Sequence, residues 1–555
     1  MKLILAQLNY IVGDIEGNAL KILQAYETGR SEDGLLICSE LALTGYYPQD
    51  LVYQTDFLSR QDKMLAMLAE ATEGYMGGMV VGMIARNESG TGKRLYNALV
   101  VLQNGQQTFE YHKRLLPTYN VFDEARHFKS GENSAIFNYR GFRIGVLICE
   151  DAWVQSGDFV YAHDPVKALA NHTLDLVISL NASPSNLGKL KERQIIISKV
   201  ANELDVPVVY VNQVGGNDEL VFDGASFIVN RQGQIVFQLT AFEEQIAAIE
   251  LNKIEHSVAV PYSLNDSELF YRQTVLGIKD YVQKCGFSQV VIGSSGGIDS
   301  AVTLAICTEA LGAENMTAIT MPSPFSSKGS VDDSRDLCEN LGVKLLFSSI
   351  AEEFELAKKQ FEQMTGEVPS SLTLENIQAR IRGRKLMEYS NHYGALVVST
   401  GNKSEMSVGY ATLYGDMNGG INPLGDLYKM EVYALAHYIN QKAEKNVIPL
   451  DIIVKAPSAE LSENQRDSDS LPDYPILDAI LKRYIEGDLL DSVESQLCTD
   501  TIKQSGMIEN EIAKIHRMVD NAEFKRRQAP PIIRVQKRSF GMGRRLPVAA
   551  ISRRS

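Results

Sequence analysis

Short apolar runs alternate with polar, helix-like stretches along the first 250 residues. The runs are LILAQL, GLLICSELAL, MVVGMIA, ALVVLQ, FRIGVLICED, LDLVISLNAS and VPVVYVNQ. Continuous apolar runs of this length, rich in Val and Ile, are typical of buried strands. The helical stretches between them predict a layered α/β fold, and residues 1–250 are long enough to form one complete domain.

The alternation of apolar runs and helix-like stretches is interrupted once and then resumes. Residues 251–266, LNKIEHSVAVPYSLND, lose the pattern and contain a proline, which predicts a linker. In the second domain, 267–555, SQVVIGSSGGIDSAVTLAICTEAL predicts a strand, a glycine-rich turn and a helix, and ENMTAITMPSP and GALVVSTGNKSE predict further strand-to-loop junctions. Ligands of open parallel sheets bind at the carboxyl ends of strands, so these junctions are candidate binding sites.

Composition agrees with a globular chain of two domains. The 555 residues exceed what one core usually supports, and 45% are hydrophobic and 22% charged. No apolar run approaches the roughly 18 to 20 residues that span a bilayer, and MKLILAQLNY is too short for a signal peptide. The six cysteines stand singly, as expected for thiols in a reducing compartment. We therefore expect a cytoplasmic protein with no membrane partner.

Charge narrows the class of ligand. The formal net charge of −15 argues against a protein that binds long nucleic acids. The stretch from Lys525 to the end is basic, and we expect most of it to be a solvated or partly disordered tail, with an anionic ligand only near Lys525. The acidic stretch 458–475 predicts a surface loop.

A cysteine at a strand end is the main chemical candidate of the first domain. Cys149 follows RIGVLI, Glu40 ends LLICSE, and Lys113 follows another predicted strand. Attack of a thiolate on an amide needs a base for the thiol proton and a cation beside the thiolate. Taken singly, the cysteine has a core role as its alternative, and Glu40 and Lys113 have plain solvent exposure.

The contexts SELALTGYYPQD, YHKRLLPTYNVFDEARHF and GVLICEDAW resemble the Glu-Lys-Cys motifs of the nitrilase or carbon-nitrogen hydrolase superfamily. This resemblance implies an α-β-β-α sandwich in which Glu40 is the general base, Lys113 stabilises the tetrahedral intermediate and Cys149 is the nucleophile. Its glutamine-hydrolysing branch implies that Tyr119, Ser183 and Lys189 bind glutamine. The alternative for those last residues is a loop tyrosine and ordinary turn residues.

The most specific pattern of the second domain is the glycine-rich loop GSSGGIDS. Its backbone N–H groups and the following helix suit phosphate oxygens, Ser295 and Ser300 add hydroxyl donors, and Asp299 suits magnesium. The Gly-Lys-Ser ending of the Walker loop is absent. A plain strand-to-helix turn is the alternative. The candidate ATP-binding residues of the loop are Gly293, Ser294, Ser295, Gly296, Gly297, Ile298, Asp299 and Ser300.

The loop resembles that of the ATP-pyrophosphatase group, which implies a doubly wound parallel sheet of the adenine nucleotide α-hydrolase-like type. The stretches SLTLENIQARIRGRKLM, VVSTGNKSEMSVGYATLYGDMNGGINPLGDLYK and EFKRRQAP are similar to NAD synthetases. Over nearly the whole chain the sequence resembles the glutamine-dependent NAD synthetase family. That family implies amidation of deamido-NAD through an NAD-adenylate, with ATP as co-substrate, Mg²⁺, ammonia from glutamine, and a homo-oligomer.

The resemblance also implies roles for matching positions. Glu405 would join Asp299 at the metal. The other ATP contacts would be Thr400, Lys429 and Ser458, and the deamido-NAD contacts would be Asn376, Arg380, Glu405, Asp416 and Lys525. Either Arg380 or Arg382 could face the ligand, with an exposed helix face as the alternative. Leu413 and Gly420 depart from the ammonia-dependent enzymes, which carry Lys and Asp there, so neither is assigned.

Two other functions remain open from sequence. The synthetase domain could amidate another carboxylate or a tRNA base, although the net charge disfavours tRNA. Alternatively, the first domain could be non-catalytic and the synthetase could use free ammonia. The segment MPSPFSSKGSVDDS, 321–334, follows a predicted strand and is a candidate mobile lid.

Overall fold

The computed structural model describes residues 1–30, 34–154, 161–255, 263–463 and 465–550. It forms two compact units, unit 1 from Met1 to Ser263 and unit 2 from Leu264 to Ser555. Part of the expected linker is helical and belongs to unit 1, since α5 spans Leu251–Ile254. Residues 256–262 of that linker lie outside the described residues, and α6 begins at Asp266.

Unit 1 contains two mixed six-stranded sheets and a small hairpin. The first sheet has the order β14-β1-β2-β3-β4-β5, with strands Gln245–Glu250, Lys2–Gln7, Gly34–Ile37, Gly78–Arg86, Leu95–Gln103 and Gln106–His112. The second has the order β13-β12-β9-β8-β7-β6, with strands Ile235–Gln238, Phe227–Val229, Val208–Asn212, Leu176–Asn181, Phe142–Ile148 and Ile136–Tyr139. The hairpin pairs β10, Val214–Asn217, with β11, Leu220–Asp223.

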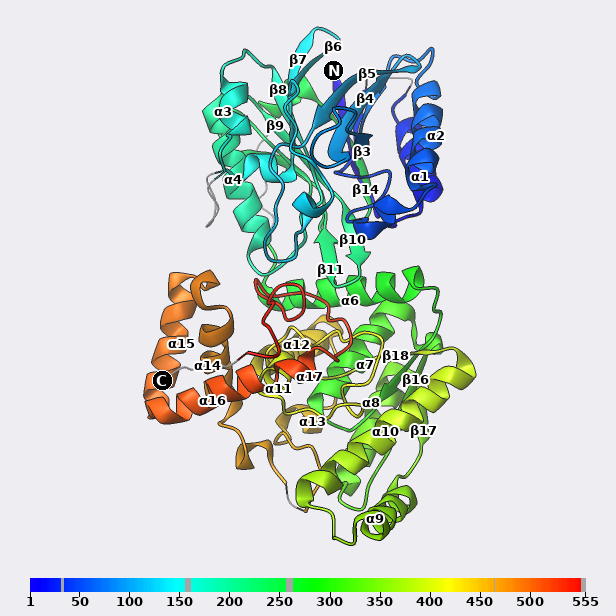
Figure 1. The fold of residues 1–555 in the computed structure, drawn as a ribbon, viewed down its shortest axis with the longest axis vertical. Helices are drawn as coiled ribbons and strands as arrows, with labels where there is room; N and C mark the ends of the chain where they lie inside the picture. Colours follow the sequence, from blue (N-terminus) through cyan, green and yellow to red (C-terminus); the bar gives the residue numbers. More distant parts are fainter. Residues whose placement is uncertain (31–33, 155–160, 256–262, 464, 551–555) are drawn as a thin grey trace. The chain divides into compact units, whose positions relative to one another are not determined.

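The sheets of unit 1 pack face to face between two helical layers (Figure 1). Leu3 of β1 and Val146 of β7 share one core cluster, which lies between the sheets. Ile4 points the opposite way and packs with Ile22 of a helix, as the alternation of side chains along a strand requires. The outer helices are α1, α2, α3 and α4, spanning Ile15–Glu27, Phe57–Glu70, Pro165–Ala170 and Lys189–Leu204. This is the expected α-β-β-α sandwich.

Unit 2 is built on a four-stranded sheet whose neighbouring strands are all parallel. Its order is β17-β16-β15-β18, with strands Lys344–Phe347, Met316–Thr320, Val290–Gly293 and Leu396–Val397. The chain moves outward from β15 to β17 and then returns to place β18 on the other side of β15. That reversal opens a crevice at the carboxyl ends of β15 and β18, where ligands of doubly wound sheets bind.

Helices cover both faces of this sheet. Val291 of β15 packs with Ile381 of α10 and Phe354 of α9, so Val290 and Ile292 point to the opposite face, where α7 contacts β15 and β16. The longer helices of unit 2 are α6, α7, α8, α9, α10 and α12, spanning Asp266–Lys284, Ile298–Leu311, Lys328–Leu341, Ala351–Thr365, Ser371–Tyr393 and Lys429–Lys442. The short helices α11 and α13 span Lys403–Val408 and Leu450–Val454.

A late group of helices completes unit 2. It consists of α14, α15, α16 and α17, spanning Tyr474–Ile485, Ser492–Ser505, Glu509–Asn521 and Glu523–Arg526. Leu477, Val519 and Phe540 share one buried cluster in this part of the chain. None of the helices in the described ranges is long and apolar enough to cross a membrane.

The prediction of a solvated basic tail is wrong for residues 532–540. Ile533 and Val535 are fully buried, and Val535 N and Gln536 N donate to Asp426 Oδ2 at 2.8 and 2.7 Å. Lys403, itself fully buried, donates to Glu486 and to the Arg538 carbonyl at 2.7 Å and pairs with Asp426. Backbone groups of this stretch thus serve as partners for a buried carboxylate and a buried ammonium group, which composition alone does not reveal.

Candidate active sites

Cys149 begins a single helical turn, Cys149–Ala152, directly after β7. Its backbone is left-handed, with a φ of 44°, and its side chain is almost fully buried. Burial raises the pKa of the thiol well above its usual value, and the charge of Glu40 raises it further, while Lys113 opposes both. The resting thiol is therefore neutral at physiological pH, and a base must take its proton during attack.

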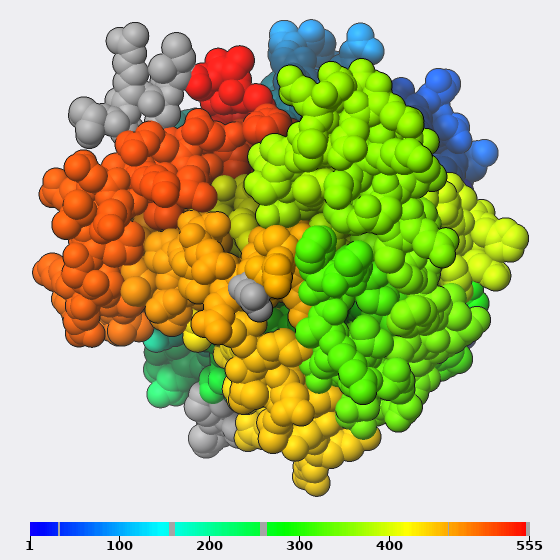
Figure 2. Space-filling view, turned by 90° about the horizontal axis from the view of Figure 1, so that it is seen from below, coloured from blue at the N-terminus to red at the C-terminus, as the bar shows by residue number. Residues whose placement is uncertain are grey.

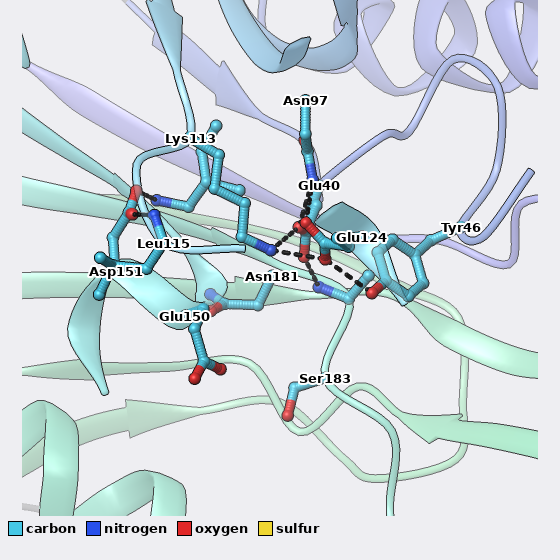
Figure 3. A network of polar contacts seen from close by, with 12 residues as sticks. Glu40, Tyr46, Asn97, Lys113, Leu115, Glu124, Glu150, Asp151, Asn181 and Ser183 are labelled. Carbon is cyan, nitrogen blue, oxygen red and sulfur yellow. Dashed lines mark hydrogen bonds and ion pairs between the residues drawn. The ribbon is translucent and has the colours of Figure 1, made fainter. Parts of the chain in front are cut away.

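Lys113 and two carboxylates form a buried charge cluster (Figure 3), and the charges of all three act on Cys149. Lys113 Nζ donates to Glu40 Oε1 at 2.6 Å and to Glu124 Oε1 at 2.7 Å. Burial lowers the pKa of Lys113, but the two carboxylates outweigh it and hold the pKa well above the usual value. Burial also raises the pKa of Glu124. The cluster thus keeps a cation in the interior of unit 1, where its charge acts on Cys149.

Neighbouring polar groups fix the orientation of Glu40 and Glu124. Asn97 Nδ2 donates to Glu40 Oε1 at 2.7 Å, and the Ala182 backbone N–H donates to Glu40 Oε2 at 2.9 Å. Tyr46 donates its hydroxyl to Glu124 Oε1 at 2.8 Å. Because the two oxygens of Glu40 are engaged by different partners, its plane is defined before any substrate binds.

A buried aspartate joins the lysine segment to the cysteine turn. Asp151 Oδ1 accepts the backbone N–H groups of Arg114 and Leu115, and its Oδ2 accepts that of Ile148. Lys113 and Cys149 are thus held in register by one carboxylate that lies two residues after the cysteine.

The expected glutamine-binding residues lie near another carboxylate of this site, that of Glu150. Tyr119 donates its hydroxyl to both oxygens of Glu150, at 3.0 and 3.1 Å, and Tyr161 donates to Glu150 Oε1 at 2.8 Å. Lys189, the first residue of α4, lies 3.7 Å from the ring centroid of Trp153. In Figure 3, Ser183 and Glu150 lie on the same side of the Lys113 cluster.

Sequence reasoning missed Glu124 and Glu150. Glu124 lies within YHKRLLPTYNVFDEARHF, the stretch chosen for Lys113, and Glu150 follows Cys149 directly. A signal was present, because an acidic residue inside a reactive motif is a candidate for the site. Spacing along the chain does not tell which of several acidic residues faces inward.

The glycine-rich loop of unit 2 is preorganised by its own serines. Gly297 N donates to Ser295 Oγ at 3.2 Å, and Ser295 N and Ser300 Oγ lie 3.3 Å apart. Gly296 has a φ of 73°, and a Cβ there would lie 2.2 Å from the Ser330 carbonyl oxygen, so no larger residue fits. The loop leads into α7, whose first N–H groups are free for phosphate oxygens.

Asp299 and Glu405 share one ammonium group. Lys429 Nζ donates to Asp299 Oδ2 at 2.6 Å and to Glu405 Oε1 at 3.0 Å. Asn402, the N-cap of α11, donates to Asp299 Oδ1 at 3.0 Å. The first turns of α7, α11 and α12 therefore meet beyond the carboxyl ends of β15 and β18, at the switch point of the sheet.

These residues line a cavity of about 680 Å³. Its walls include all of Gly293–Ser300 together with Thr400, Glu405, Asp416, Lys429 and Ser458. They also include residues of the candidate lid, such as Phe325 and Ser330, and of the acidic loop, such as Glu460 and Asp467. Segments near 320–390, green, and near 450–470, orange, come together on the face shown in Figure 2.

Not every expected dinucleotide contact lines this cavity. Arg382 does, whereas Asn376, Arg380 and Lys525 are not part of its wall. Those three support one loop, 409–416: Asn376 Oδ1 accepts from the Thr412 hydroxyl at 2.8 Å, Arg380 Nε donates to the Leu413 carbonyl at 3.2 Å, and Lys525 donates to the Gly409 and Ala411 carbonyls at 2.8 Å.

The residues at the switch point fit a magnesium ion. In the described parts of the chain no cluster of three or more His, Cys, Asp or Glu residues could enclose a metal. Mg²⁺ needs less, because it usually binds through one or two carboxylates and takes its other ligands from phosphates and water. Asp299 and Glu405 supply such a pair. Asp467 Oδ1, buried nearby in the cavity wall, has no hydrogen-bond partner among the described residues.

Comparison with known proteins agrees with this arrangement. Residues 2–257 match the family of carbon-nitrogen hydrolases, and residues 270–529 match that of NAD synthases. The chain is 41% identical to the glutamine-dependent NAD(+) synthetase of Synechocystis sp., over 98% of each chain. It is 40% identical to that of Acinetobacter baylyi, over 99% of this chain and 98% of the relative.

Solved structures agree over the same length. The glutamine-dependent NAD+ synthetase of Acinetobacter baumannii, solved in complex with adenosine diphosphate, is 38% identical, with a TM-score of 0.76 and coverage of 99% of this chain and 98% of that chain. The enzyme of Cytophaga hutchinsonii, at 21% identity and a TM-score of 0.82, shares the fold. Full-length similarity and the two sites together show that the chain belongs to the family of glutamine-dependent NAD(+) synthetases.

Proposed function

We propose that this chain makes NAD from deamido-NAD, with unit 1 releasing ammonia from glutamine and unit 2 using ATP to activate the acceptor. One observation carries the proposal: a single chain holds a buried Glu40–Lys113 pair beside Cys149 and a phosphate loop beside a pair of carboxylates. The ATP co-substrate fits the 680 Å³ cavity around that loop.

In unit 1, Glu40 removes the thiol proton as Cys149 Sγ attacks the amide carbon of glutamine. Lys113 donates a hydrogen bond to the oxyanion that forms, an effect worth about 10²–10³ in rate. The amine leaves as ammonia after Glu40 returns the proton, and a thioester remains. Water, deprotonated by Glu40, then attacks the thioester, and glutamate and the free thiol are regenerated.

The substrate's charged ends find complementary groups in unit 1. The carboxylate of Glu150, held by two tyrosine hydroxyls, suits the α-ammonium of glutamine. Ser183 and Lys189 suit its α-carboxylate. Tyr119 acts through Glu150 and completes that side of the pocket.

In unit 2, the nicotinate carboxylate of deamido-NAD attacks the α-phosphate of ATP, and pyrophosphate leaves to give the adenylate. Ammonia then attacks the acyl carbon, AMP leaves, and a proton lost from nitrogen gives the amide. The loop N–H groups, Thr400, Ser458 and Lys429 hold the phosphates. Asp416 and the 409–416 loop, supported by Asn376, Arg380 and Lys525, receive the dinucleotide.

Magnesium, when bound by Asp299 and Glu405, supplies positive charge that offsets the charge of the phosphates. Removal of Mg²⁺ with EDTA is expected to abolish NAD formation from either nitrogen source. Glutamine hydrolysis is expected to stay at the level measured without ATP, because the Lys113 cluster of unit 1 needs no metal.

The deciding experiment incubates the full chain with deamido-NAD, ATP, Mg²⁺ and glutamine and measures NAD, AMP and glutamate. Equal amounts of all three are expected. Glutamate without NAD would mean another acceptor, and NAD from ammonia alone would mean that unit 1 is non-catalytic. The variant Cys149→Ala is expected to lose glutamine use and to keep ammonia use, whereas equal glutamine use by both proteins would overturn the role of Cys149.

The proposal includes the assembly and the location of the enzyme. We take residues 1–250 as the amidohydrolase domain and 267–555 as the synthetase domain, in a cytoplasmic homo-oligomer. Light scattering coupled to size-exclusion chromatography tests the assembly, because a mass of 61.5 kDa would show a monomer.

A further inference from the structure

Arg193 of α4 is the largest fully buried side chain of the protein that the structure describes, with 1% of its surface exposed. Its guanidinium spreads over the chain at Ser183. Arg193 Nε donates to Ser183 Oγ at 3.1 Å, and Nη2 donates to the carbonyls of Ser183 and Pro184 at 2.7 and 2.9 Å. Nη1 donates to Asp223 Oδ1 at 2.6 Å.

The charge of Arg193 is compensated inside the protein. Asp223, at the end of β11, is 2% exposed and pairs with Arg193 away from solvent. Burial lowers the pKa of Arg193, but Asp223 outweighs it and raises the pKa above the usual value. The guanidinium is thus a permanent, neutralised fork that joins α4, the loop after β8 and the β10–β11 hairpin. It is not a free cation that would itself attract an anion.

The serine that Arg193 holds belongs to the rim of the glutaminase site. Ala182, its neighbour, donates its N–H to Glu40 Oε2, and Ser183 N donates to Asn212 Oδ1 at 2.9 Å. The Ser183 backbone is therefore fixed on both sides. The O–H bond of Ser183 can still rotate, so the direction of its hydrogen depends on the contacts of Oγ.

The contact with Arg193 decides that direction. A serine hydroxyl has one hydrogen to donate and lone pairs that accept. Because Arg193 Nε already donates to Ser183 Oγ, this oxygen faces Arg193 as an acceptor, and its own hydrogen is available as a donor elsewhere. A hydroxyl fixed as a donor suits a carboxylate oxygen and does not suit an ammonium group.

We infer that Arg193 is a positioning residue that holds Ser183 as a hydrogen-bond donor for the α-carboxylate of glutamine. It thereby selects amides that carry this carboxylate over simple amides. The inference rests on the proposed glutamine site and adds a residue that does not touch the substrate. The selection acts on binding, because the α-carboxylate is remote from the bond that breaks.

The test compares Arg193→Lys and Arg193→Gln with Ser183→Ala and with the double variant, all in the full chain. Glutamine KM is expected to rise about 10-fold in each single variant, as for loss of one charge-assisted hydrogen bond, with kcat changed less than about 3-fold. The double variant is expected to be no worse than Ser183→Ala, because both changes remove the same hydrogen bond.

Two readouts separate positioning from loss of structure. Inactivation of Cys149 by iodoacetamide, an amide without an α-carboxylate, is expected to keep its wild-type rate in the Arg193 variants, and ammonia-dependent NAD formation is expected to be unchanged. Gln194→Met is the matched control, since Gln194 is the next residue of α4 and its side chain donates to Gln238 of β13 and not to Ser183. Its glutamine KM should stay within about 2-fold.

The outcomes distinguish the two levels of the proposal. An unchanged KM in Ser183→Ala would contradict the glutamine site itself. A raised KM in Ser183→Ala with an unchanged KM in both Arg193 variants would overturn the inference alone, as would parallel loss of glutamine hydrolysis and iodoacetamide reactivity. If neither Arg193 variant folds, Asp223→Asn loosens the same fork, and a glutamine KM that stays at the wild-type value there would also overturn it.

Discussion

Lys429 Nζ lies 2.6 Å from Asp299 Oδ2, and the same ammonium reaches Glu405 at 3.0 Å. One lysine thus pairs with both carboxylates proposed for magnesium. Burial lowers the pKa of Lys429, but Asp299 and Glu405 outweigh it and raise the pKa above its usual value. The lysine is therefore charged throughout the working pH range, and it can serve the carboxylates or the phosphates.

Substitution of this lysine should separate the two activities. Lys429→Met is expected to lower NAD formation by about 100-fold with glutamine and with ammonia, because a preorganised cation is lost beside the phosphates. Glutamine hydrolysis without ATP is expected to be unchanged. Lys442→Met is the control, since Lys442 lies on the same helix, is half-exposed, and contacts Glu309 and the Tyr271 ring. An equal effect of both substitutions would mean that α12 as a whole is sensitive.

Glu124 is expected to matter as much as a residue of the triad. Glu124→Gln keeps the shape of the side chain but removes one of the two charges that hold Lys113, so glutamine hydrolysis should fall by about 10- to 100-fold. Ammonia-dependent synthesis should not change. Steady-state release of glutamate measures the effect, and Glu110→Gln, a half-buried pair to His112 in β5, serves as the control. A wild-type rate of glutamine hydrolysis in Glu124→Gln would show that Glu40 alone is enough to hold Lys113.

Arg380 and Arg382 should differ although they are two residues apart. Arg382 lines the cavity around the glycine-rich loop, and burial lowers its pKa to about 10. Among the described residues it donates only to the Met321 carbonyl, through Nε. Arg382→Met is expected to raise the KM for ATP by about 10- to 100-fold, as for loss of a hydrogen bond to a charged group. Arg380→Met should leave that KM within about 3-fold. The reverse ranking would place Arg380 at the nucleotide.

The stability of unit 2 should depend on pH through Asp478. This residue of α14 accepts from the Ser404 hydroxyl and the Met430 N–H, and burial raises its pKa from 3.8 to about 6. Its contribution to stability is fully present below pH 4 and is lost as the pH rises through 6. An asparagine does not ionise, so Asp478→Asn lacks this pH-dependent loss of stability. Between pH 4 and 7 the free energy of unfolding of the variant should therefore rise by up to about 3 kcal/mol relative to that of the wild type.

Hydrogen exchange of the α14 amides, followed by mass spectrometry at pH 4, 5, 6 and 7, measures this difference. Above pH 7 the free energies of unfolding of the two proteins should change with pH at the same rate, because the aspartate is then ionised in both the folded and the unfolded state. A constant difference over the whole range would mean that Asp478 stays ionised in the folded protein.

The layered fold could be predicted from the apolar runs, and so could the places of the candidate residues, because each of them follows a strand. Cys149 comes directly after β7, Lys113 directly after β5, and Asp299 follows the loop that ends β15. The apolar runs locate the strand ends, and parallel strands bring their ends to one edge. That local rule needs no knowledge of which distant segments meet.

The features that the sequence pattern could not predict depend on contacts between distant segments of the chain. Whether Arg380 or Arg382 faces the cavity follows from the rotation of α10 against β15, and no pattern within ENIQARIRGRKLM encodes that rotation. The stretch QKRSFG looks like a solvated tail, yet its Arg538 carbonyl is an acceptor for Lys403, 135 residues earlier. Composition shows how many charges a segment has. Only the fold shows whether its charged and polar groups have hydrogen-bond or ion-pair partners.

This late anchoring has a consequence for biosynthesis. The buried Lys403 can donate to the Arg538 carbonyl only after residue 538 has been made. Asp426 likewise can accept the N–H groups of Val535 and Gln536 only after those two residues have been made. While the ribosome is still translating residues 430–530, the helix that carries Glu405 therefore lacks its final support. Unit 1 can close its sheets during that interval, but the nucleotide site can mature only after residues 535–538 have been made.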